Sequence, residues 1–174
     1  MSRRRKHAKN RKGPAHLAVC RGALRTALGG LAGYALLLLA AVVGGLSEAL
    51  AQGPWLTLLW GAVLALAGYA TLCLYGYQRV ARWGAVGAIL LVAGVVTWFP
   101  PTEFISMTLQ ALGLAGFSLV LFDLGRVLDR PVEVPGGLIF LAVVGVVLNT
   151  PITVLAGLAL LAAGALLAWR RLGL

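Results

Sequence analysis

The chain has 174 residues, 60% of them hydrophobic, and 15 Lys and Arg against 5 Asp and Glu give a net charge of +10. A soluble core of this length could not bury so much apolar surface, so the composition excludes an ordinary soluble domain. In a soluble protein the basic surplus would suggest nucleic acid, but in a membrane protein the position of each charge matters more than the sum.

The chain begins with a basic arm, residues 1–22, in which Gly13-Pro14 breaks any helix and no apolar stripe at helical spacing is visible. We expect a solvated cytoplasmic arm that contacts anionic lipid, because basic residues near a membrane surface are attracted to it. The alternative is a docking segment for RNA or a partner protein. The candidate contact residues in either case are Arg3, Arg4, Arg5, Lys6, Lys9, Arg11 and Lys12.

The first helical pair is predicted over 23–79, with helices at about 28–50 and 55–78. The basic lead, the apolar run and Ala49-Leu50-Ala51 resemble a signal peptide with its cleavage site, but the run is long for that role, which favours an uncleaved helix. Gly29 and Gly33 form a GxxxG pair, a spacing that lets a neighbouring backbone approach closely.

The second pair is predicted over 83–126. Pro100-Pro101 ends its first helix at about residue 99, and Thr102 can cap the next, which runs to about residue 124. Gln110 is the strongest polar group at depth, and we interpret it as an interhelical hydrogen-bond donor or acceptor; the alternative is a pore or pocket contact. Asp123 and Arg126 lie three residues apart on one face, which predicts an interfacial ion pair.

The third pair is predicted over 136–171. Its first helix, 136–148, is too short to cross a bilayer as a straight helix unless it gains residues from about 132 onward or the bilayer thins locally. Asn149-Thr150-Pro151 then forms a tight turn, and the last helix, 152–169, ends in Arg170-Arg171.

These pairs predict an all-α, polytopic membrane protein with six transmembrane helices in three tandem helical hairpins, occupying residues 23–174. All the clusters of basic residues fall at ends that six alternating spans place on one side. Loops rich in Lys and Arg stay in the cytoplasm, so we expect a cell-membrane protein with both termini inside. Cys20 and Cys73 would then lie at the reducing side, which argues against a disulfide, and two isolated cysteines make no metal site.

Spaced glycines flank a proline turn in two of the pairs: Gly94, Pro100 and Gly116 in one, and Gly145, Pro151 and Gly164 in the other. With the three-hairpin pattern, these positions resemble the HdeD-type acid-resistance family of membrane proteins. The resemblance covers roughly 83–171 well and 23–79 poorly, and the turns read Phe-Pro-Pro or Asn-Thr-Pro where that family often has Asn-Pro. It implies a stress-linked membrane protein, and it carries over no catalytic residue.

The predicted spans hold no charge away from their ends, whereas proton relays and ion-coupled transporters usually place charges at depth. No catalytic triad, paired carboxylates, metal cluster or phosphate-binding loop is visible either. We therefore expect a non-enzymatic structural or accessory subunit without cofactor or metal, packed against other membrane subunits or its own copies. The alternative is a small passive channel or transporter built from parallel hairpin repeats, lined by Ser106, Thr108, Gln110 and Ser118.

Overall fold

The structure, a computed structural model, describes residues 14–44, 55–78, 82–96, 103–128, 131–148 and 150–173, and this part of the chain is helical throughout apart from short turns. The helices are α1 Pro14–Val43, α3 Trp55–Gln78, α4 Arg82–Val96, α5 Glu103–Leu128, α6 Glu133–Val147 and α7 Pro151–Leu172. The all-α prediction is therefore confirmed.

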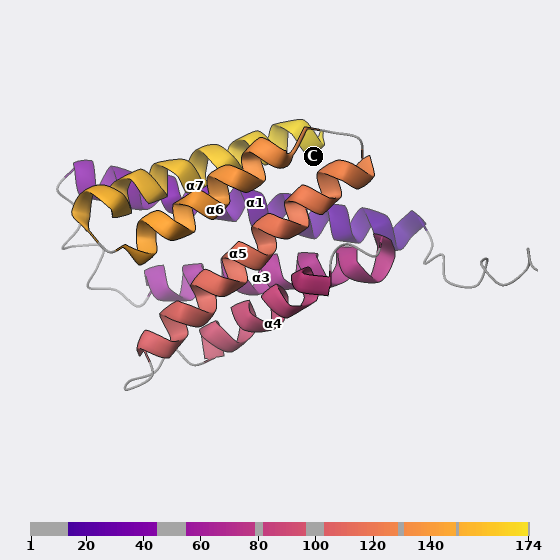
Figure 1. Ribbon diagram of the computed structural model, residues 1–174, viewed down its shortest axis with the longest axis horizontal. Helices are drawn as coiled ribbons and strands as arrows, with labels where there is room; N and C mark the ends of the chain where they lie inside the picture. Colours follow the sequence, from indigo (N-terminus) through magenta and orange to yellow (C-terminus); the bar gives the residue numbers. More distant parts are fainter. Residues whose placement is uncertain are drawn as a thin grey trace, which may run out of the picture.

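Helices that follow one another along the chain pack side by side, and α1 also packs against α7, so the contacts close into a ring. A smaller contact between α3 and α5 crosses this ring. Figure 1 shows the helices alternating in direction, so that the start of α1 and the C-terminus lie at the same end of the bundle. We call this the terminal end, and the end where α4 finishes and α5 begins the opposite end.

The first helix starts much earlier than the sequence analysis expects. α1 begins at Pro14, whereas the prediction placed this helix at about 28–50 and assigned residues 14–22 to the arm. Proline is well tolerated at the first position of a helix, where its missing N–H group would have no partner. The early turns also carry an apolar stripe, since Cys20, Ala23 and Leu24 are buried. Residues 1–13 lie outside the described residues.

The other helices begin within three residues of their predicted starts, while α5 and α7 end four and three residues later than predicted. α3 has the predicted bounds, and α6 gains its first turn from Glu133, upstream of the predicted start. α7 begins at Pro151 with Thr150 as its N-cap: the Thr150 hydroxyl accepts a hydrogen bond from the Thr153 amide, and the Thr153 hydroxyl accepts one from the Thr150 amide. Thr102, the predicted cap of α5, lies outside the described residues.

Four of the described helices are long and apolar enough to cross a membrane: Ala18–Val43, Trp55–Leu74, Ile105–Gly125 and Pro151–Leu172. The other two, α4 and α6, have 15 residues each. At about 1.5 Å per residue such a helix is roughly 22 Å long, shorter than the hydrocarbon layer of about 30 Å. The apolar helices indicate a membrane-embedded protein, and the crossing of α4 and α6 stays a prediction.

The described surface of the bundle carries many large apolar side chains. Phe117, Leu28 and Leu64 are fully buried, while Ile89, Met107 and Ile152 are each more than 60% exposed. Large exposed apolar side chains occur on all six helices. Contiguous apolar surface of this kind is costly in water and natural in lipid.

Candidate functional site

Of the four buried polar side chains in the described part of the chain, Ser106 and Gln110 on α5 belong to one hydrogen-bond network between helices. The Trp60 indole Nε1 on α3 donates to Gln110 Oε1 at 2.8 Å, and Gln110 Nε2 donates to Ser106 Oγ at 2.9 Å and to the Gly94 carbonyl at 3.3 Å. The Ser106 hydroxyl also donates to the Gly94 carbonyl, at 2.6 Å. We call Trp60, Gly94, Ser106 and Gln110 the Gln110 network.

The sequence positions each member of this network for a local reason. Ser106 and Gln110 are four residues apart and so lie one above the other on α5. Gly94 lies two residues before the end of α4, and a Cβ atom there would come within 2.7 Å of Gln110 Cγ. A glycine is therefore required for α5 to come this close. On the other side, the ring of Tyr34 on α1 stacks on Trp60 with centroids 4.6 Å apart, so the network touches four helices.

Both ends of the Gln110 amide are used by the protein. Gln110 is 6% exposed and Ser106 1% exposed. The Gln110 amide has hydrogen-bond partners on α3, α4 and α5 and therefore links these helices. Lipid tails offer no hydrogen-bond partner, so such polar groups bond to one another. This is the interhelical contact that the sequence analysis put first for Gln110.

The other proposed lining residues of α5 point elsewhere. Ser118 is fully buried, and its hydroxyl donates to the Ala115 carbonyl one turn earlier on the same helix. Thr108 is exposed on another face of α5. Ser106, Thr108, Gln110 and Ser118 therefore do not form one continuous polar face.

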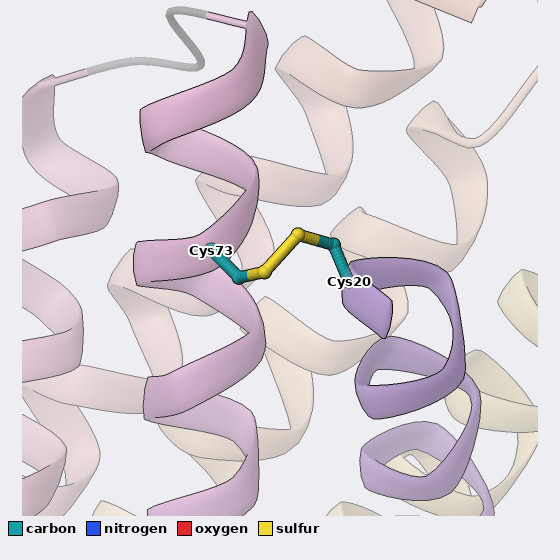
Figure 2. Close-up of a disulfide and its surroundings, with 2 residues drawn as sticks. All are labelled: Cys20 and Cys73. Atoms are coloured by element: carbon teal, nitrogen blue, oxygen red, sulfur yellow. A yellow bond between two sulfur atoms is a disulfide. The ribbon is translucent and has the colours of Figure 1, made fainter. Parts of the chain in front are cut away.

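The structure contradicts the sequence analysis on the cysteines: Cys20 and Cys73 form a disulfide between α1 and α3. Figure 2 shows the two side chains meeting between the two helices. Their Cα atoms are 5.5 Å apart. The early start of α1 is the physical reason, because it places Cys20 inside a helix that packs on α3. The compartment argument assumed accessible thiols, whereas Cys20 is 0% and Cys73 9% exposed, which keeps aqueous reductants away.

Four arginines lie at the terminal end of α1 and α7. The Arg25 guanidinium carbon lies 5.6 Å from the centre of the Trp169 ring, a cation–π contact between the two helices. Arg171 Nη1 donates to the Pro131 carbonyl at 2.5 Å, which fixes the end of α7 to the segment before α6. Arg21 and Arg170 are exposed.

Several predicted residues cannot be placed. Arg3, Arg4, Arg5, Lys6, Lys9, Arg11 and Lys12 lie outside the described residues. Asp123 is half-buried on α5, but the side chain of Arg126 is not among those described, so their ion pair stays a prediction. Within the described part of the chain there is no group of three or more His, Cys, Asp or Glu residues that could hold a metal ion.

Comparisons with protein-family models, curated proteins and solved structures found no match to this chain. The resemblance to the HdeD-type family therefore stays a prediction. The sequence singled out Gln110 but not its partner Trp60, 50 residues away. It also missed the contact between Arg25 and Trp169. Trp60 and Trp169 are visible in the sequence as aromatic residues. Only the packing of the helices shows that their partners are Gln110 and Arg25.

Proposed function

We propose that this chain is a non-enzymatic integral membrane protein that acts as a structural or accessory subunit, with a basic N-terminal arm that contacts anionic lipid. In this proposal all six helices cross the cell membrane as three tandem hairpins, and both termini are cytoplasmic. The short helices α4 and α6 cross where the bilayer thins around the bundle. A stress-linked role is what the resemblance to the HdeD-type family adds.

The observation that carries the proposal is the state of Gln110. A channel or a transporter offers polar groups to water, ions or substrate along its path. Here the side-chain amide of Gln110 forms hydrogen bonds that hold α3, α4 and α5 together. Close contacts between glycines and neighbouring backbones add to the same picture of a bundle built for tight packing.

Purification in mild detergent tests the subunit role. We expect the protein in its own membranes to migrate as part of a larger assembly of fixed stoichiometry, held by its apolar outer faces. A lone monodisperse monomer, together with flux of small solutes through reconstituted liposomes that Gln110→Leu abolishes, would overturn the proposal in favour of a passive channel. A matched variant, Thr108→Val on the exposed face of α5, controls for general effects on the bundle.

Cysteine labelling tests the topology. In a Cys20→Ser/Cys73→Ser background, a cysteine at Thr150 should react with an impermeant reagent added outside, and a cysteine at Gly173 should not. Labelling at Gly173 from outside would contradict the cytoplasmic termini. Failure to label at Thr150 would show that α6 does not cross.

A further inference from the structure

The contact between α1 and α7 at the terminal end concentrates positive charge. Arg21 and Arg25 are four residues apart on α1 and both exposed, so they share one face of that helix. On α7, Arg170 is exposed and directly follows Trp169, the residue whose ring lies against Arg25. We call Arg21, Arg25, Trp169 and Arg170 the α1–α7 seam.

No described carboxylate neutralises these arginines. The acidic side chains that the structure describes lie on other helices, Asp123 on α5 and Glu133 on α6, and Arg21, Arg25 and Arg170 have no ion pair within the described part of the chain. The like charges of Arg21 and Arg25, four residues apart on one face of α1, repel each other, and an anion bound between them relieves the repulsion most directly. Five N–H donors in a planar fork make each arginine suited to a phosphate group.

The position of the seam selects the kind of phosphate. Arg21 lies in the second turn of α1 and Arg170 in the last turn of α7, at the end of two of the candidate spans. Arginine at such a level extends its guanidinium toward the headgroups while its aliphatic stem stays in the apolar layer. Trp169, half-buried, is an aromatic residue of the kind that prefers this interface.

Trp169 gives the seam its geometry. Its ring holds the Arg25 guanidinium at one place between α1 and α7, so that Arg25 reaches the α7 side instead of extending freely into solvent. On the face of α1 that carries Arg25, the exposed residues toward the middle of the helix are Gly29, Gly33 and Leu36, which are all apolar. A headgroup bound by the arginines would therefore have its acyl chains lying along an apolar helix surface.

We propose that the α1–α7 seam binds the phosphate of an anionic glycerophospholipid, with Arg21, Arg25 and Arg170 as the donors and Trp169 as the residue that positions Arg25. The site rests on the proposed membrane location and on a terminal end that faces an anionic leaflet. It is separate from the basic arm, because all four residues lie within α1 and α7. Basic sites between helices on the cytoplasmic side are known to select anionic headgroups.

The test is lipid titration of the purified full-length protein in a neutral detergent, read by native mass spectrometry. Phosphatidylglycerol should bind tightly and phosphatidylcholine weakly. Because each basic residue near the surface contributes on the order of a fivefold gain in affinity, Arg25→Gln/Arg170→Gln should lower the affinity for phosphatidylglycerol about 25-fold. Arg25→Lys/Arg170→Lys, which keeps the charges but loses the planar forks, should give a smaller loss.

Two matched variants separate the seam from charge in general. Arg79→Gln/Arg130→Gln removes two charges outside α1 and α7, and deletion of residues 2–12 removes seven from the arm. Both should retain the tight phosphatidylglycerol site. Equal losses in the seam variant and in the Arg79/Arg130 variant would overturn the proposal, and so would a loss confined to the arm deletion.

Further arms identify the ligand and guard against misfolding. Inorganic phosphate at millimolar concentration should not displace the lipid; displacement would show that a free anion suffices. A short RNA that competes with phosphatidylglycerol on the wild type but not on the seam variant would assign the seam to nucleic acid. Without lipid, the seam variant should melt slightly below the wild type, because it loses the cation–π contact between Arg25 and Trp169, and only the wild type should gain stability from phosphatidylglycerol. A seam without lipid selectivity in a protein that still purifies as a subunit would sink this inference and leave the proposed function standing.

Discussion

In the helix pairs α4–α5 and α6–α7, a glycine allows the two helices to pack closely, but different residues face that glycine. Both pairs bring a glycine near the end of the first helix against the second: Gly94 in VAGVV at 92–96, and Gly145 in VVGVV at 143–147. A Cβ atom at Gly145 would lie 2.8 Å from the Thr153 carbonyl oxygen and 3.2 Å from the Gly157 Cα atom. At Gly94 the corresponding obstacle is Gln110, whose Cγ atom would be 2.7 Å away.

The residue that faces each glycine decides whether the helix pair is linked to a third helix at that place. Opposite Gly145 stands another glycine, so α6 and α7 meet there through backbone and Cα atoms. Opposite Gly94 stands Gln110, whose backbone N would be 3.0 Å from the added Cβ atom and whose side-chain amide accepts a hydrogen bond from Trp60 on α3. The glycine sets how close two helices come, and the residue facing it decides whether the contact extends to a third helix. At these glycines α6 and α7 meet by close packing, whereas α4 and α5 also carry a polar link.

A third pair, α1–α3, is held by a covalent bond, and its removal should have the largest effect. The disulfide joins residues 53 apart in sequence. Cys20→Ser/Cys73→Ser should lower the free energy of unfolding by about 2–4 kcal/mol, because the unfolded chain loses a long cross-link. Denaturant titration in detergent micelles measures this.

A chemical control keeps that result interpretable. The wild-type protein treated with reductant under unfolding conditions should match the double serine variant. If the intact protein shows two free thiols by mass spectrometry after trapping with an alkylating reagent, the disulfide does not form and the α1–α3 pair is held by packing alone.

Adding one methyl group should distinguish the two glycine contacts. Gly145→Ala should destabilise the protein by about 1–3 kcal/mol, since the new Cβ atom meets backbone that cannot rotate away. Gly94→Ala should cost a similar amount and should also change the fluorescence of Trp60, because Gln110 must move. If Gly94→Ala and the wild type have equal fluorescence spectra, Gln110 has not moved away from Trp60. The proposed difference between the two glycine contacts would then be wrong.

Gly33 on α1 offers the control for these substitutions. The sequence analysis interpreted the Gly29–Gly33 spacing as a place of close approach, but no atom comes within 4 Å of a Cβ built at either position. Gly33→Ala should therefore be neutral or stabilise by up to about 1 kcal/mol, as alanine is the better helix former. A marked loss of stability would mean that another chain packs on this face.

The Gln110 link itself should contribute less than the backbone contacts. Gln110→Leu leaves the Trp60 N–H group without its partner and should cost about 1–2 kcal/mol. The coupling between Gln110→Leu and Trp60→Phe in a double-mutant cycle should be about 0.6 kcal/mol, the average for hydrogen bonds between membrane helices. A coupling near zero would show that Gln110 does not tie α3 to α5.

The sequence predicted what is local and missed what depends on packing. The starts of α3 and α7 were predicted at residues 55 and 152 and lie at Trp55 and Pro151, since helix starts depend on residues within one turn, whereas α7 ends three residues beyond the predicted residue 169. The start of α1 was wrong because Gly13-Pro14 was interpreted as a break and not as the beginning of a helix. That error hid the disulfide, because Cys20 faces Cys73 only when the helix already exists there. Gln110 could be chosen from its polarity, but Trp60, Ser106 and Gly94 become its partners only through the ring of helices.

The smallest expected effect lies at the turns that open α5 and α7, and it would sharpen the comparison between the pairs. At Thr150 the hydroxyl accepts from the Thr153 amide while the Thr153 hydroxyl accepts from the Thr150 amide, so two otherwise unpaired N–H groups are satisfied. Thr150→Ala should cost about 1 kcal/mol, and Thr150→Ser, which keeps the hydroxyl, much less. Thr102 precedes α5 at the position where the sequence predicts the same kind of cap. If Thr102→Ala lowers stability as much as Thr150→Ala, the second helix of each pair begins with a threonine cap. The two pairs then differ mainly in the residue that faces the glycine. A cost at Thr150 but not at Thr102 would instead mean that the hydrogen bonds of Ser106 and Gln110 stabilise the start of α5. On α7 the residue that faces Gly145 is Gly157, which has no side chain to form such bonds.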